Sequence, residues 1–169
     1  MNPTEALTVI IVNFNGMKWL RECLETLGKQ TRSDIKIIVV DNCSTDGSTD
    51  FIHVNFPDVS VIESRTNVGF GKANNLGAKA ASEGLLLFLN NDTSVDSAAL
   101  ERLASYKNTH ALNIVGTRML DFNGNDTSHN GLTIDFLASP GGPGNHLFYV
   151  EGCALLISKH DFDRLGGFD

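Results

Sequence analysis

Five consecutive apolar residues, Leu85 to Leu89, are followed without a break by Asn90, Asn91 and Asp92. A short apolar run bounded by polar residues is typical of a strand that is buried on both faces. Open α/β sheets bind their ligands at the carboxyl ends of such strands. The sequence therefore predicts a strand that delivers two amides and a carboxylate to a ligand-binding edge. The alternative is an ordinary turn, for which Asn and Asp are also common.

Apolar runs alternate with helical patterns along the rest of the chain. Strand and helix in repeated succession assemble as a parallel sheet with right-handed crossovers, which predicts an α/β fold. The predicted strands cover residues 7–12, 35–40, 59–62, 85–89 and 148–157. The predicted helices cover residues 17–29 and 97–106, together with three shorter segments, one ending at Phe56, one following Gly69 and one starting at Ser158.

Two of these helices have a predicted apolar face, because apolar residues recur at helical spacing. The apolar positions are Trp19, Leu20, Cys23, Leu24 and Leu27 in the first helix, and Ala73, Leu76 and Ala80 in the helix after Gly69. We expect both faces to pack on the sheet.

Composition limits the classes of function. The 169 residues fit one domain, and the net charge of -7 argues against nucleic acid or anionic lipid as the main ligand. No segment reaches the ~20 apolar residues of a membrane span, and the first residues lack the pattern of a signal peptide. Three widely spaced cysteines favour neither a disulfide framework nor a zinc site. We therefore expect a cytoplasmic protein.

Polar side chains follow several predicted strands at the point where each strand ends. Asn13 follows the first strand, Asp41 the second and Asn90 to Asp92 the fourth. In a parallel sheet these ends share one edge, so the carboxylates of Asp41 and Asp92 are expected to face a common cleft. Asp41 is a candidate acceptor for a nucleobase N–H or a ribose hydroxyl, and Asp92 is a candidate ligand for a divalent cation. The alternative for Asp41 is a local Asx-turn.

Two basic residues flank the loop that follows the third predicted strand. Arg65 and Lys72 are candidates to contact the base or the phosphates of a nucleotide, and the alternative is a solvated surface for both. The same loop contains Gly69-x-Gly71, which resembles part of a dinucleotide fingerprint. However, Asn74 occupies the third glycine position and the loop follows a third strand, so a doubly wound cofactor-binding domain is disfavoured.

Taken together, several segments resemble the family 2 glycosyltransferases. The segments are Val9–Gly16, Val39–Ser48, Asn67–Gly77, Phe88–Thr93, Glu151–Ile157 and Gly166–Asp169. The resemblance implies the GT-A nucleotide-diphospho-sugar transferase fold, with a mostly parallel central sheet and helices on both faces. It also places Asn13, Asp41 and Arg65 around the nucleotide.

In this resemblance, Asn90 to Asp92 occupy the family's Asp-x-Asp position. The last Asp of that motif implies Mn²⁺ or Mg²⁺ bound at Asp92 and bridging the diphosphate of a UDP- or dTDP-linked sugar. Asn90 replaces the first Asp of the motif. In this respect the sequence resembles the branch of the family that contains rhamnosyltransferases and other polysaccharide-building enzymes. The replacement also removes one charge from the cation site.

The chemistry implied by the resemblance is inverting transfer of the sugar to an acceptor hydroxyl on a glycan or lipid-linked acceptor. The protein would then approach a membrane only through its acceptor. The family's catalytic base usually lies beyond the Gly-Gly-Phe-Asp segment, which leaves Glu151 and Asp169 as the candidates for the base within this sequence. We expect one domain over 1–169, with a nucleotide-sugar-binding half (1–110) and a partial acceptor-side half (111–169) that lacks its C-terminal part. A chain of this kind would bind donor but transfer sugar poorly, and the alternative function is a non-catalytic nucleotide-sugar-binding module.

Overall fold

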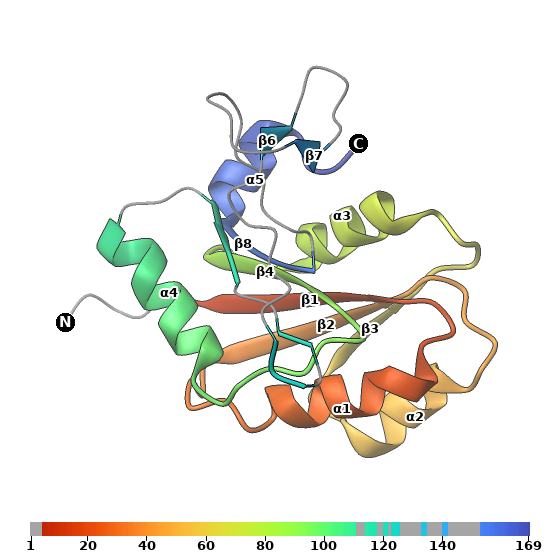
Figure 1. Ribbon diagram of the computed structural model, residues 1–169. Coiled ribbons are helices and arrows are strands. Elements are labelled where there is room, and N and C mark those ends of the chain that lie inside the picture. The colour runs from red at the N-terminus through yellow and green to blue at the C-terminus, as the bar shows by residue number, and fades with distance from the viewer. Residues whose placement is uncertain are drawn as a thin grey trace.

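A six-stranded sheet forms the centre of the protein (Figure 1). The computed structural model describes residues 5–110, 114–117, 120–121, 123–125, 133–134, 140–141 and 153–169. The sheet strands are β1 (Leu7–Asn13), β2 (Ile35–Asp41), β3 (Ser60–Glu63), β4 (Leu85–Asn90), β5 (Ile114–Gly116) and β8 (Ala154–Ser158), and a separate short pair consists of β6 (Thr133–Ile134) and β7 (Pro140–Gly141). The helices are α1 (Met17–Leu27), α2 (Ser48–Asn55), α3 (Phe70–Ala80), α4 (Ala99–His110) and α5 (Lys159–Leu165).

The strand order is β3-β2-β1-β4-β8-β5, and the pairs from β3 to β4 are all parallel. Strand β8 runs antiparallel to both of its neighbours. The sheet is therefore mostly parallel, as predicted. Of the predicted strand 148–157, residues 148–152 lie outside the described residues, and the remainder corresponds to β8.

The two faces of the sheet carry separate cores because alternate residues of each strand point to opposite sides. Along β1, Val9 and Ile11 face the core formed with α1, α2 and α4, whereas Ile10 and Val12 face the core formed with α3 and α5. Figure 1 shows α1 and α2 below the sheet and α3 and α5 above it. The prediction of helices on both faces is confirmed.

The predicted face of α3 is right at Ala73 and wrong at Leu76 and Ala80. Leu76 is 40% exposed and Ala80 is exposed, whereas Gly77 and Ala78 are buried with Ala73. A Cβ on Gly77 would lie 2.5 Å from Ile10 Cγ2, so the helix approaches β1 more closely than a larger side chain would allow. Small residues define this contact face, which a search for large apolar residues misses.

The predicted face of α1 is right at four positions and wrong at Trp19. Leu20, Cys23, Leu24 and Leu27 are buried, whereas Trp19 is 40% exposed. The ring of Trp19 contacts Lys18 Nζ, which lies 4.1 Å from its centroid, a cation–π geometry. The helix needs only its narrow stripe of smaller residues to cover β1, so the indole stays outside.

The C-terminal segment folds back on α3. The Asn75 side chain donates to Phe168 O at 2.7 Å and accepts from Phe168 N at 2.9 Å. The Phe168 ring packs edge-on against Phe88 of β4 and Phe162 of α5. These contacts hold the Gly-Gly-Phe-Asp segment beside the start of α3.

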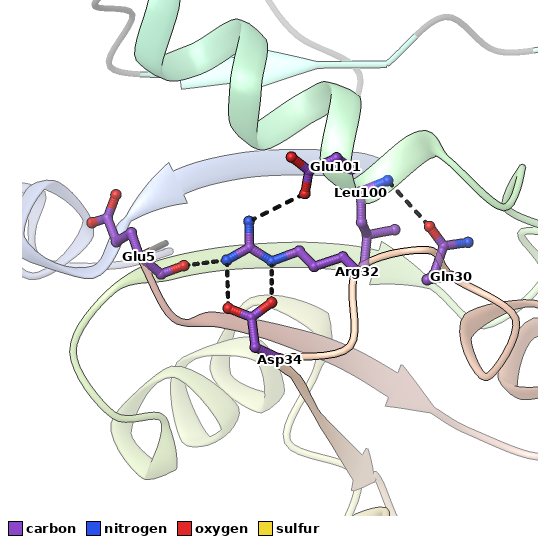
Figure 2. A network of polar contacts seen from close by, with 6 residues as sticks. All are labelled: Glu5, Gln30, Arg32, Asp34, Leu100 and Glu101. Atoms are coloured by element: carbon purple, nitrogen blue, oxygen red, sulfur yellow. Dashed lines mark hydrogen bonds and ion pairs between the residues drawn. The ribbon is translucent and has the colours of Figure 1, made fainter. Parts of the chain in front are cut away.

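A buried arginine, Arg32, connects the segments that precede β1 and β2 to α4 (Figure 2). The Arg32 side chain is 5% exposed, and its Nε and Nη2 lie 2.8 and 3.0 Å from the two carboxylate oxygens of Asp34. Arg32 Nη2 also donates to the carbonyl oxygen of Glu5, and Nη1 lies 4.0 Å from Glu101 Oε2 on α4. One side chain thus joins the segment before β1, the segment before β2 and α4.

None of the described helices is long and apolar enough to cross a membrane.

We expect Arg32→Met to lower the free energy of unfolding by about 1.5–3 kcal/mol, the range for hydrogen bonds to charged groups. The loss stays below that of a fully buried ion pair because Asp34 and Glu101 are about half exposed. Urea unfolding measures the change, and Arg102→Met is the matched control because the Arg102 side chain is 78% exposed. Equal, small changes in both variants would contradict this account.

Candidate nucleotide and metal site

A pocket of about 340 Å³ lies at the edge where β1, β2 and β4 end. We call it the asparagine pocket; its described lining is Val12, Phe14, Asn42, Asn67, Phe70, Asn90, Asn91 and Asp92. Strand register explains its position, because Asn13 is paired with Asp41 and Val12 with Asn90. The polar residues that follow three parallel strands therefore reach the same level, as predicted. The rings of Phe14 and Phe70 are both about half exposed at its rim.

Asn13 lies at the centre of the polar contacts beneath this pocket. Its side chain is completely buried, and its Nδ2 is 3.1 Å from Asp41 Oδ1 and 2.8 Å from Ser48 Oγ. The same nitrogen lies 3.1 Å from Ser44 Oγ. On the other side, Asn13 Oδ1 accepts from Asn91 Nδ2 at 3.0 Å. Asn13 thus joins the ends of all three strands, and its predicted direct contact with a nucleotide stays a prediction.

Asp41 is also buried, with 4% exposure. One carboxylate oxygen accepts from Asn13, and the other accepts from Ser44 N at 2.9 Å. The second bond is local, as in the alternative interpretation of this residue, but it runs to a backbone N–H three residues on and not two, so it is not an Asx-turn. Both oxygens therefore have partners within the protein, and Asp41 is not among the described residues that line either cavity, so the prediction that it faces a common cleft with Asp92 is wrong. The predicted hydrogen bond to a base or ribose stays a prediction.

The loop after β1 and the loop after β2 are joined by a second set of polar contacts. Asn15 N donates to Ser44 Oγ at 2.9 Å, and Asn15 Oδ1 accepts from Thr45 N at 2.8 Å. Asp46 accepts from Met17 N at 2.9 Å and from Ser48 N at 3.1 Å. Met17 and Ser48 are the first residues of α1 and α2, so one carboxylate serves two helix N-termini.

These contacts act on the protonation of Asp46. Desolvation is the largest single effect and opposes the charge, but the hydrogen bonds from Ser48 and Met17 together outweigh it and lower the pKa of Asp46 below its ordinary value of 3.8. The carboxylate form is thus favoured by folding.

Asn42 holds the segment before α3, which forms one wall of the asparagine pocket. It is 3% exposed, its Nδ2 donates to Asn67 Oδ1 at 2.9 Å, and its Oδ1 accepts from Val68 N at 2.9 Å. Asn67 Oδ1 also accepts from Gly69 N at 3.0 Å. With its oxygen engaged twice, Asn67 has its amide N–H groups available as donors at the pocket.

The Asn90–Asp92 segment at the end of β4 lies between α1 and the asparagine pocket. Asp92 is exposed, whereas Asn90 and Asn91 are half-buried. Cys23 of α1 lies beneath, with its Sγ 3.7 Å from Asn90 O. Burial, and then the charge of Asp92, raises the pKa of the Cys23 thiol to about 12. The thiol therefore stays protonated and donates to the Asn90 carbonyl.

A second cavity, of about 1030 Å³, adjoins the same segment on the side of α4 and β5. Leu87, Leu89 and Val115 form part of its floor, and Thr93, Tyr106 and Asp121 are among its polar lining. Asn90 and Asp92 line both cavities. Asp92 thus lies where the two cavities meet.

The oxygen ligands at and beside Asp92 fit a hard cation if a phosphate completes the coordination. Within the described residues no three His, Cys, Asp or Glu side chains are close enough together to hold a metal ion by themselves. Asp92 supplies one carboxylate, and the neighbouring amides supply neutral oxygens. Mg²⁺ and similar cations bind to one or two carboxylates when a substrate phosphate completes the coordination. The residues therefore fit a cation that arrives with a phosphate ligand.

The remaining predicted site residues lie outside the asparagine pocket. Arg65 and Lys72 are exposed, and neither is among the described residues that line the pocket. Asp169 is exposed, and its carbonyl oxygen would lie 2.8 Å from a Cβ on Gly71, so the residue sits beside the first turn of α3. Glu151 lies outside the described residues. The roles assigned to these four residues stay predictions.

Several residues of the site were not identified from the sequence. They are Phe14, Asn42, Asp46, Ser48, Asn67 and Phe70. The clearest signal was available at Asn42, because it follows Asp41 directly and lies at the end of the same strand. Asp46 acts on a helix 29 residues away in the sequence, which local capping rules do not reveal.

Comparisons with known proteins agree on the type of fold. A sequence model described as "Glycosyl transferase family 2" matches residues 8–165. Poly(ribitol-phosphate) beta-N-acetylglucosaminyltransferase TarS from Staphylococcus aureus (strain Mu50) is 29% identical over 122 residues, which is 69% of this chain and 21% of TarS.

Two solved structures resemble the fold. S. aureus TarS 1–349 in complex with UDP-GlcNAc superposes with a TM-score of 0.73 at 20% identity, covering 95% of this chain and 47% of that one. Mannosyltransferase PcManGT from Pyrobaculum calidifontis, in complex with GDP-Man and Mn²⁺, has a TM-score of 0.76 at 17% identity, covering 99% of this chain and 48% of that one. The predicted GT-A fold is confirmed. This chain spans about a fifth to a half of the length of these proteins.

Stability should depend on pH through Asp46. Because folding lowers the pKa of Asp46, its contribution is fully present above the unfolded value of 3.8 and is lost as the pH falls through the folded value. Wild type should therefore be more stable than Asp46→Asn at pH 6, and the difference should shrink at pH 3. Urea unfolding at both pH values measures this, with the exposed Asp58→Asn as control. A difference that is the same at both pH values would contradict the assignment.

Removing the Asp41 carboxylate should destabilise the fold. In Asp41→Ala the buried Asn13 amide and the Ser44 N–H lose their acceptor, which costs about 1–3 kcal/mol. Asp41→Asn keeps one acceptor oxygen and should lose less. The measurement is the free energy of unfolding in urea, and the exposed Asp58→Ala should stay within about 0.5 kcal/mol of wild type.

Proposed function

Because this chain belongs to glycosyl transferase family 2, we propose that it binds a nucleotide-diphosphate sugar in the asparagine pocket and transfers the sugar to an acceptor hydroxyl. The observation that carries the proposal is the position of Asp92 where the asparagine pocket meets the larger cavity. The nucleotide occupies the asparagine pocket, and the acceptor approaches through the larger cavity. In this proposal residues 1–110 form the nucleotide-sugar half, and 111–169 contribute to the acceptor side.

The chemistry of the pocket supports a nucleotide. Phe14 and Phe70 offer two half-exposed aromatic rings at the rim, and aromatic rings stack on nucleobases. Asn67 presents amide donors, and Asn90 and Asn91 supply further amide groups. Arg65 and Lys72 lie on the segment that leads into α3 and on its first turn, from which long side chains can reach the phosphates.

Asp92 is the proposed ligand for Mn²⁺ or Mg²⁺. A cation bound there together with the diphosphate supplies positive charge that stabilises the leaving nucleoside diphosphate. The protein's role in this step is to orient the donor sugar at the junction of the two cavities. The acceptor oxygen then attacks the anomeric carbon from the face opposite the leaving group, which inverts the anomeric configuration. The proposed base is a carboxylate, with Glu151 or Asp169 as candidates. Asp169 is not among the described residues that line the larger cavity, so as the base it would reach the acceptor from the side of α3.

The donor is proposed to be UDP- or dTDP-linked. The UDP-GlcNAc complex of TarS supports the first. Asn90 at the first position of the Asn90–Asp92 segment supports a rhamnosyltransferase-like enzyme and hence the second. The acceptor is proposed to be a glycan or a lipid-linked glycan, in line with the polymer named for TarS. A turnover panel with UDP-GlcNAc and dTDP-rhamnose separates the two donors.

The test of the proposal is the cation dependence of nucleotide binding. Asp92→Asn should abolish the Mn²⁺-dependent part of UDP or dTDP affinity, measured by calorimetry, because it removes the carboxylate at the junction. The fold should survive, because Asp92 is exposed. The exposed Asp58→Asn is the control. Unchanged affinity in Asp92→Asn would show that the diphosphate binds elsewhere.

Transfer and binding are separate outcomes. Nucleotide binding without any sugar transfer, both in this chain and in a protein extended by its native C-terminal continuation, would favour the second candidate, a non-catalytic nucleotide-sugar-binding module. A response to NAD or FAD without metal, and none to UDP or dTDP, would overturn both.

A further inference from the structure

The direction of the Asn13 side-chain amide is determined by its neighbour. Its Nδ2 lies 3.1 Å from Asp41 Oδ1, and an ionised carboxylate can only accept hydrogen bonds. The nitrogen must therefore face Asp41 and the hydroxyl of Ser48, which leaves Asn13 Oδ1 on the side of β4. That oxygen can only accept, so its partner must be a donor.

The partner is the amide of Asn91, whose Nδ2 donates to Asn13 Oδ1 at 3.0 Å. With its nitrogen engaged, Asn91 has its oxygen at the opposite end of the planar amide. Among the described residues no donor is bonded to this oxygen, and Asn91 lines the asparagine pocket beside Asp92. Asp41 thus sets the orientation of Asn91 through Asn13, although the two outer residues are 50 positions apart in the sequence.

Gly16 provides the space for this contact. A Cβ on Gly16 would lie 2.0 Å from Asn91 Nδ2 and 2.4 Å from Asn13 Oδ1, the two atoms of the hydrogen bond. The backbone of Gly16 has φ -101° and ψ 16°, which other residues also adopt. The need for glycine at this position comes from space and not from backbone conformation.

We propose that Asn13 is a positioning residue: held on Asp41, it orients the Asn91 amide so that an oxygen acceptor faces the ligand beside Asp92, and Gly16 leaves room for this relay. The part that concerns the ligand rests on the proposed function. The acceptor oxygen suits an electropositive group, either a cation or a hydroxyl hydrogen of the ligand.

The main experiment compares two Gly→Ala variants at the two ends of α1. Gly16→Ala should block the Asn91–Asn13 hydrogen bond. Gly28→Ala is the control because its Cβ would meet nothing closer than 3.6 Å and its φ is -66°. Side-chain amide hydrogen exchange by NMR, without ligand, should show faster exchange at Asn91 in Gly16→Ala only. UDP affinity, measured with and without Mn²⁺, should fall at least about tenfold in Gly16→Ala in the presence of Mn²⁺ and stay within about twofold in Gly28→Ala.

A second variant, Asn91→Asp, keeps the proposal testable if Gly16→Ala does not fold. A carboxylate at position 91 cannot donate to Asn13 Oδ1, so the relay predicts weaker binding of UDP in spite of the added negative charge beside Asp92. If Asn91→Asp weakens UDP binding only when Mn²⁺ is present, the Asn91 oxygen interacts with the cation. If it weakens UDP binding both with and without Mn²⁺, the Asn91 oxygen accepts from a hydroxyl of the ligand.

The results that would overturn the proposal are distinct from those that would overturn the proposed function. Unchanged Asn91 exchange in Gly16→Ala, or tighter Mn²⁺-dependent binding in Asn91→Asp, would overturn the relay. Wild-type protein that binds no nucleotide would overturn the proposed function, and the exchange measurement alone would then decide whether the relay exists.

Discussion

The hydrogen bond from the Asn13 amide to Asp41 is the interaction on which the site depends. It joins the carboxyl ends of β1 and β2 at a point where both side chains are almost fully buried. A buried polar group is costly unless it is bonded, so Asn13 and Asp41 stabilise the edge only as long as both stay paired. Ser44, Ser48 and Asn91 complete the pairing, and each belongs to a segment that leads into the pocket.

The network also explains why the pocket has a definite shape in a region built from loops. Asp46 holds the starts of α1 and α2 at fixed positions, and Asn42 does the same for the turn before α3. Asp46 bonds to the backbone N–H of Met17 and Asn42 to that of Val68, so these backbone positions are determined by side chains from another segment. In the proposed function, the nucleotide meets a wall whose geometry is set before binding, which lowers the ordering entropy lost on association.

The sequence predicted the sheet well because its strands are strong, local signals. Leu85 to Leu89 form a buried strand as expected, and the residues after it reach the predicted edge. The face of α3 was predicted correctly only at Ala73, because Gly77 and Ala78 pack through close approach, which hydrophobic periodicity does not register. The strand order could not be read from the chain either, since β8 inserts between β4 and β5 in the antiparallel direction.

The candidate site was predicted at the level of strand ends and not at the level of contacts. Asn13, Asp41 and Asn90 follow apolar runs, so their common edge followed from parallel topology. That Asn13 is buried and Asp92 exposed depends on which side chains cover them, which a pattern in one segment does not contain. Gly16 shows the same limit, because its role depends on an amide 75 residues further along the chain.

The attachment of the segment between β3 and α3 has a consequence for motion. Strand β1 is bonded on both sides and wholly buried, so its end can open only with the whole sheet. Residues 65–69, by contrast, are attached to the sheet edge mainly through the side chain of Asn42. This segment can detach by breaking these two hydrogen bonds and the contact between Cys43 Sγ and Arg65 O, and by separating Val68 from the core against which it packs. One wall of the pocket can therefore open while Asn13, Asp41 and Asn91 stay in place, and a ligand can exchange without separation of the strands.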